Sequence, residues 1–152
     1  MNTPRPLSAC SGSTLGLLIR QIRDGMWARM ERELATVGHD LTFSQYVAIK
    51  KLADGIASVT DLARAAELNP GAMTRLLDKL ETRGLIARVA DPTDRRALHI
   101  HLTDAGKAIW ADVDQCGKRV REAALAGLDD AERERFTRLL EKVRDNLSAP
   151  ES

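Results

Sequence analysis

Aromatic residues are scarce in this chain: phenylalanine, tryptophan and tyrosine together make up 3% of the sequence, against 43% for all hydrophobic residues. The core must therefore consist mostly of leucine, alanine, valine and isoleucine. A core of this kind fits packed helices, and the charged fraction of 30% is normal for a soluble globular protein.

Cysteine is almost absent as well. The two cysteines, Cys10 and Cys116, are too few for a disulfide framework and lack the spacing of metal ligands. In a reducing cytoplasm we expect both to be free thiols.

Long apolar segments and a large excess of one charge are also missing. No apolar run approaches the ~20 residues of a membrane-spanning helix, and residues 1–13 lack the apolar core of a signal peptide. We therefore expect a cytoplasmic protein with no membrane partner. The formal net charge is +1, so any basic surface that binds nucleic acid must be local.

The sequence is organised around a helix that is predicted from Asn69 to Gly84. Asn69 is a good N-cap, and a proline at the first helical position after it costs no hydrogen bond. Gly84 stands where a left-handed C-terminal residue is favoured. Four residues at helical spacing form one buried stripe: Met73, Leu76, Leu77 and Leu80. The opposite face is small and polar near its start.

Two shorter helices precede this one, over residues 43–52 and 58–66. Thr42 and Gln45 form a capping box for the first of them, and Ser58 caps the second. Two short helices, a tight turn and a helix with a small, polar outer face are the layout of a helix-turn-helix motif.

The segment that follows changes to the period of strands. Residues 85–89 and 97–102 predict two strands, joined by a polar turn over 91–96 that carries Arg95 and Arg96. A β-hairpin placed directly after a helix-turn-helix is a wing. The predicted fold is therefore mainly α with a small β-hairpin wing, and residues 41–102 form a winged helix-turn-helix lobe that binds DNA.

Long helices are predicted on either side of the lobe, over residues 14–37 and, in two pieces, over 103–147. Their apolar positions exceed what one neighbouring helix could cover, and an exposed patch of that size normally marks an interface. We expect these helices to make the protein a two-fold homodimer. Residues 1–13 form a flexible tail in this scheme, and residues 148–152 a fraying one.

The chain resembles the MarR family of winged helix-turn-helix transcriptional regulators. Residues 69–80 are similar to the recognition helix of that family, residues 84–86 and 91–96 to its strand and wing, and residues 102–106 to the entry of its dimerisation helix. The resemblance covers roughly Leu15 to Leu147. It implies a homodimer that binds a double-stranded DNA operator, with repression as the default. It also implies a cleft for a small lipophilic or aromatic effector between the dimer region and the DNA lobe.

The residues expected to contact DNA lie on the recognition helix and at the wing tip: Asn69, Pro70, Gly71, Ala72, Thr74, Arg75, Lys79, Arg95 and Arg96. For Arg75 the alternative is a structural ion pair with Asp78 or Glu81. For the wing, Asp94 can pair with Arg96 within the turn. The arginine that matches Arg96 is the usual wing contact in the family, and we retain both wing arginines.

The residues expected to line the effector cleft lie on the first helix and at the bend that follows it: Trp27, Met30, His39, Phe43 and Tyr46. Methionine and aromatic side chains form adaptable pockets for apolar compounds. The alternative is plain core packing, which for Phe43 and Tyr46 is individually the better interpretation.

Two alternative functions use the same fold. One is a redox-sensing regulator that acts through Cys10 or Cys116, which requires a thiol of lowered pKa. The other is a winged helix that binds protein and not DNA, against which the placement of Arg75, Arg95 and Arg96 argues.

Catalytic and metal-binding patterns are not found in the sequence. No Ser/His/Asp set, phosphate-binding glycine loop or carboxylate pair stands in a plausible context, so we expect neither an enzyme nor a cofactor. His99 and His101 alternate on the outer face of the wing without further ligands at a matching spacing. We interpret both as solvated side chains.

Overall fold

The computed structural model describes residues 12–56, 58–94 and 98–148. Within them the chain forms the following elements: α1 (Gly12–Thr36), α2 (Phe43–Ala53), α3 (Val59–Ala65), α4 (Pro70–Thr82), β1 (Ile86–Ala90), β2 (Leu98–Leu102), α5 (Asp104–Ala124) and α6 (Asp130–Ser148). The predicted fold class is confirmed, and the predicted element ends differ from these bounds by only a residue or two.

The helix ends follow from short-range hydrogen bonds that the sequence encodes. The backbone N–H of Gln45 donates to Thr42 Oγ1 over 3.2 Å, and the backbone N–H of Thr42 donates to Gln45 Oε1 over 3.1 Å. The two hydrogen bonds complete the capping box. Asn69 Oδ1 accepts from the Ala72 N–H over 2.8 Å. Gly84 follows the last turn of α4 with φ of 73°, a conformation that suits glycine.

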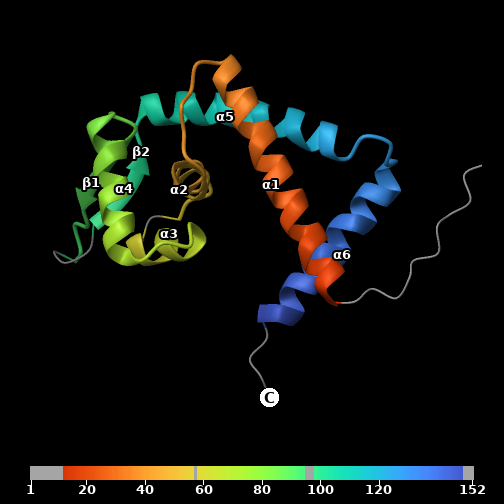
Figure 1. Ribbon diagram of the computed structural model, residues 1–152. Coiled ribbons are helices and arrows are strands. Elements are labelled where there is room, and N and C mark those ends of the chain that lie inside the picture. Colours follow the sequence, from red (N-terminus) through yellow and green to blue (C-terminus); the bar gives the residue numbers. More distant parts are fainter. Residues whose placement is uncertain (1–11, 57, 95–97, 149–152) are drawn as a thin grey trace, which may run out of the picture.

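The winged lobe consists of α2, α3, α4 and the β1–β2 hairpin, which Figure 1 shows gathered at one end of α5. Its core is aliphatic, as the composition predicts, with Ile49, Leu62, Met73, Leu77 and Leu80 fully buried. The strands pair antiparallel, with Ile86 opposite Leu102 and Arg88 opposite Ile100. Ile86, Ile100 and Leu102 are buried and cover the core of the lobe on the side of the wing.

The start of α5 is fixed to the base of the wing by a close backbone approach. A Cβ atom on Gly106 would lie 2.0 Å from the carbonyl oxygen of Leu85, so only glycine fits there. Beside it the Thr103 hydroxyl donates to the Gly84 carbonyl over 2.6 Å. The direction in which α5 leaves the lobe is therefore set by two short contacts.

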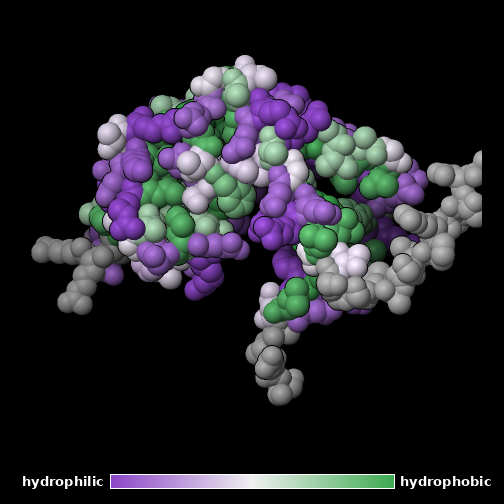
Figure 2. Space-filling view, viewed as in Figure 1, coloured by the Kyte–Doolittle hydropathy of each residue, from purple (hydrophilic) through white to green (hydrophobic). Residues whose placement is uncertain are grey.

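The opposite end of the molecule is built differently. Helix α1 crosses α5, and α6 descends from the far end of α5 (Figure 1). None of the α6 side chains is buried. Figure 2 shows hydrophobic residues on the surface over α6 and the N-terminal end of α1. The large exposed apolar residues of these two helices are Leu15, Leu17, Leu18, Ile19, Ile22, Met26, Phe136, Leu139, Leu140, Val143 and Leu147.

None of the described helices combines the length and the apolar character that crossing a bilayer would take.

Candidate nucleic-acid interface and ligand pocket

The recognition helix α4 presents an exposed, small and polar face to solvent. Gly71, Thr74 and Arg75 are all exposed on it, as is Lys79 one turn later. Beside this face lies a hollow of about 280 Å³ between α4 and the first turn of α2, which the sequence did not indicate. The residues that line it are Thr42, Ser44, Gln45, Leu68, Ala72, Arg75, Leu76 and Lys79.

The residues at the start of α4, together with its N-cap, shape the surface of this face. The side-chain oxygen of Asn69 caps the helix, so this residue has its amide N–H groups left to donate to DNA. Pro70 has no backbone N–H to offer. Ala72 is half-buried, and Gly71 leaves the helix surface flat.

Arg75 takes no part in the ion pairs of the described residues, because another arginine occupies its two candidate partners. Arg88 on β1 binds the Asp78 carboxylate directly, and its Nε lies 3.3 Å from Glu81 Oε2. This contact also joins the wing to the recognition helix, and it was not predicted from the sequence. Asp78 and Glu81 are thereby engaged by Arg88, so neither holds Arg75, which favours a role of Arg75 at an anionic ligand.

One carboxylate holds the start of the wing turn. Asp91 Oδ1 accepts from the Thr93 N–H over 2.8 Å and from its hydroxyl over 2.7 Å, and Oδ2 lies 2.8 Å from His99 Nε2. These hydrogen bonds, with the Thr93 N–H first, hold the pKa of Asp91 well below its usual range. His99 and His101 are both exposed, as expected, but His99 also binds Asp91, a partner that the spacing did not indicate. Arg95 and Arg96 lie outside the described residues.

Four of the five predicted cleft residues come together in a pocket of about 220 Å³ between α1, α2 and α5. The rings of Trp27 and Phe43 meet edge to face with centroids 5.1 Å apart, and Tyr46 lies 5.5 Å from Trp27. Met30 is almost fully buried beneath them. Burial, followed by the charges of Asp114 and Asp54, raises the pKa of the Tyr46 phenol, which keeps it a neutral donor.

Four further residues line the same pocket: Arg23, Met26, Gly117 and Val120. Gly117 and Val120 lie on α5, more than 70 positions after the bend, so no local pattern could indicate them. A Cβ atom on Gly117 would meet no other atom within 4 Å. The glycine therefore leaves space at the pocket that a larger side chain could fill.

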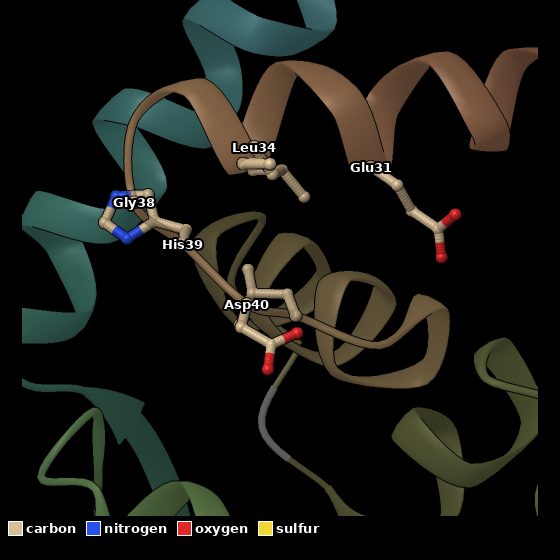
Figure 3. A pocket seen from close by; sticks show the side chains of 7 residues that line it. Glu31, Leu34, Gly38, His39 and Asp40 are labelled. Atoms are coloured by element: carbon tan, nitrogen blue, oxygen red, sulfur yellow. The ribbon is translucent and has the colours of Figure 1, made fainter.

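His39 does not line this pocket. It lies at a separate hollow of about 380 Å³ below the end of α1, with Glu31 and Asp40 among its neighbours. Figure 3 shows its ring on the side of α5, where Nε2 lies 2.8 Å from Asp112 Oδ2. The Arg83 guanidinium donates to the Asp40 carbonyl over 3.3 Å, so the bend also contacts the end of the recognition helix.

The buried cysteine does not have the surroundings of a redox sensor. Cys116 is fully buried in the core, although Arg119 Nη2 lies 3.2 Å from its sulfur. Burial is the larger influence and raises the pKa of the thiol, which disfavours the reactive thiolate. Cys10 lies outside the described residues. Within the part of the chain that the structure describes, no three histidine, cysteine or acidic side chains are grouped to bind a metal ion.

The fold and the exposed face of α4 define a class: a winged helix-turn-helix protein whose recognition helix and wing face one side. The MarR family model matches residues 41–98. The transcriptional regulator HosA of Escherichia coli O111:H- is 35% identical over 127 residues, which cover 82% of this chain and 90% of that protein. The transcriptional repressor Mb2911 of Mycobacterium bovis is 30% identical over 85% of this chain and 92% of its own.

Solved structures agree with the sequence relatives. A mutant of MarR from E. coli complexed with operator DNA superposes with a TM-score of 0.72 at 26% identity, covering 85% of this chain and 92% of that one. BpsR of Bordetella bronchiseptica, whose DNA binding is regulated by 6-hydroxynicotinic acid, gives 0.71 at 26% identity, covering 86% and 98%. This chain belongs to the MarR family, and it is a DNA-binding transcriptional regulator.

Proposed function

We propose that the protein is a homodimeric repressor that a small lipophilic or aromatic compound releases from a pseudo-palindromic operator. The observation that carries this proposal is the pocket lined by Trp27, Phe43 and Tyr46. It spans α1 and α5, which we assign to the dimer, and α2, which belongs to the DNA lobe.

The dimer is supported by the exposed apolar faces of α1 and α6. Leu139 is 53% exposed and Leu147 82% exposed, although both stand in the apolar stripe of α6. Water contact along whole stripes on two helices is unfavourable, and a second copy supplies the same stripes in return. We therefore assign residues 14–37 and 103–147 to dimerisation.

A two-fold dimer carries two recognition helices, so it suits an operator with two similar half-sites about one helical turn, ~10 bp, apart. Arg75, Thr74 and Gly71 then face the major groove in each half-site, with Lys79 one turn later, and Asn69, Pro70 and Ala72 approach the DNA backbone. Arg95 and Arg96 at the wing tip reach the adjacent minor groove.

Release follows from the position of the pocket. A compound that contacts Trp27 on α1 and Phe43 on α2 favours one distance between the two DNA-binding lobes of the dimer, whereas operator binding requires a different distance. The ligand can shift this equilibrium only by the difference in its affinity for the two spacings. A coupling of about 1–3 kcal/mol is typical and lowers operator affinity roughly 5- to 150-fold.

The test uses the fluorescence of Trp27 in a Trp110→Phe variant, in which it is the only tryptophan. A set of phenolic and aromatic compounds is titrated against the free protein and against its complex with an operator duplex. We expect a compound that quenches Trp27 to bind the complex more weakly, by the same factor by which it weakens DNA binding.

A variant that fills the pocket supplies the control. Gly117→Leu places a side chain into open space at the pocket and away from α4, so it should abolish the quenching and leave operator binding intact. Equal ligand affinities for the free and the DNA-bound protein, or an unchanged response in Gly117→Leu, would overturn the proposed control mechanism.

A further inference from the structure

The polar side chains on the exposed face of α4 are not equally available to DNA. The oxygen of Asn69 caps the helix, and Asp78 binds Arg88. Within α4 the polar side chains near the groove are therefore Thr74, Arg75 and Lys79, while Asn69 at the N-cap has only its amide N–H groups to donate. Of these three, Thr74 is the shortest and the only one without a charge.

The hydroxyl of Thr74 is already engaged within the helix. It donates to the carbonyl oxygen of Pro70, four residues earlier, over 2.9 Å. A hydroxyl has one hydrogen, so Thr74 has no donor left for a phosphate oxygen or for another acceptor. The hydrogen bond also fixes the side-chain torsion, and with it the direction of the methyl group. The exposed Thr74 therefore presents a methyl group in a defined position.

The surrounding helix allows a short side chain to reach the floor of the groove. Gly71 lies three residues before Thr74 and so on the same face of the helix. It has an exposed, flat surface, and the backbone can approach a partner closely where no Cβ atom intervenes. The half-buried Ala72 adds little height beside it.

From these contacts we infer that Thr74 is a specificity-determining residue whose methyl group reads the C5-methyl group of one thymine in each half-site. Thymine is the base that presents a methyl group in the major groove, and threonine methyl groups contact it favourably. The hydroxyl serves to hold the methyl group in place. This inference depends on operator binding by α4, as proposed above.

The experiment uses the duplex that the wild-type protein selects from a randomised pool. Each thymine of the half-site is replaced in turn by deoxyuridine, which removes only the methyl group. For the wild type we expect one position, the same in both half-sites, at which this replacement weakens binding. The expected loss is about 4-fold in affinity per half-site, the change that burial of one methyl-sized group produces. Thr74→Ser should show the same loss on the unmodified duplex and no further loss with deoxyuridine at that position.

Two variants distinguish the methyl group from the hydroxyl and from general damage to the helix. Thr74→Val keeps the methyl group and loses only the hydroxyl that holds it, so it should lose less affinity than Thr74→Ser and keep the sensitivity to deoxyuridine. Thr82→Ser is the matched control, because the Thr82 hydroxyl makes the same hydrogen bond to the Asp78 carbonyl over 2.9 Å at the far end of α4. We expect it to bind like the wild type.

Several results would overturn the inference: a selected half-site without a sensitive thymine, additive losses in Thr74→Ser, or a loss in Thr74→Val as large as that in Thr74→Ser. If the wild type selects no duplex at all, operator binding by α4 itself fails, which is a separate outcome. Thermal unfolding followed by circular dichroism confirms in each case that the variant is folded.

Discussion

The winged lobe and the long helices around it differ in how they bury their apolar residues. In the lobe, Leu62, Leu77 and Leu80 are fully buried within the chain itself. In α6, the large apolar residues of the stripe are all exposed, from Phe136 at 37% to Leu147 at 82%. The two regions have similar patterns in sequence and opposite environments in the single chain.

This difference separates two kinds of stability. The lobe buries its core within the single chain, together with Met30 and Leu34 of α1 and Val113 of α5, so its packing needs no second copy. In the proposed dimer, helix α6 buries its stripe against a second copy, so its contribution should depend on protein concentration. Substitutions in the two regions should therefore fail in different ways.

The largest effect is expected in α6. Leu139→Glu combined with Leu140→Glu places two charges in the apolar stripe, each in place of a side chain whose burial is worth about 1.5–3 kcal/mol. We expect the dissociation constant of the dimer to rise at least about 100-fold, measured by analytical ultracentrifugation, and operator binding to be lost with it.

The control for this variant is Lys142→Glu, which adds a negative charge to the same helix outside the stripe. It should remain dimeric at micromolar concentration. If the double variant also remained dimeric there, the assignment of α6 to the interface would be wrong.

An intermediate effect is expected on the DNA side of the lobe. Arg75→Ala should leave the dimer intact and weaken binding to the selected duplex by about 1–3 kcal/mol, with relaxed preference at one position. Arg75 is free for this role because Arg88 holds Asp78 and Glu81. Fluorescence anisotropy on matched and mismatched duplexes measures both changes.

Two further variants serve as comparisons for Arg75→Ala. Replacing Arg95 and Arg96 by alanine should weaken all duplexes more evenly and reduce the dependence of binding on salt, since phosphate contacts carry that dependence. Arg144→Ala on α6 should change neither property. If Arg75→Ala bound the selected duplex with wild-type affinity, Arg75 would not be a residue that contacts bases.

The sequence predicts the parts of this structure that depend on neighbours in the chain. The capping box at Thr42 and the left-handed Gly84 are both predicted correctly, because each depends only on residues a few positions away. The grouping of Trp27, Met30, Phe43 and Tyr46 was also predicted, through the family resemblance.

Contacts between distant segments could not be read in this way. His99 binds Asp91 across the hairpin, and Arg88 reaches from β1 to α4. No spacing rule specifies which carboxylate a long side chain will select once the strands and helices pack. The turn between α3 and α4 is a further case, because Glu67 adopts φ of 55° where glycine would be the expected residue.

The smallest effect, and the sharpest comparison of the two regions, comes from one glycine in each. Gly71 on α4 has room for a methyl group, since an added Cβ atom would lie 3.5 Å from the nearest atom, and Gly117 on α5 has open space. Replacing a glycine inside a helix by alanine stabilises by roughly 0.5–1 kcal/mol, with less expected at Gly71 because it lies in the first turn. Neither variant should therefore be less stable than the wild type in thermal unfolding.

The two variants should differ in function. Gly71→Ala should weaken operator binding, because the added methyl group prevents the close approach of α4, and it should leave the response of Trp27 to ligand unchanged. Gly117→Ala should bind the operator normally and shift only the ligand affinity. Equal operator affinities for the two variants would show that the flat surface at Gly71 has no role in DNA binding.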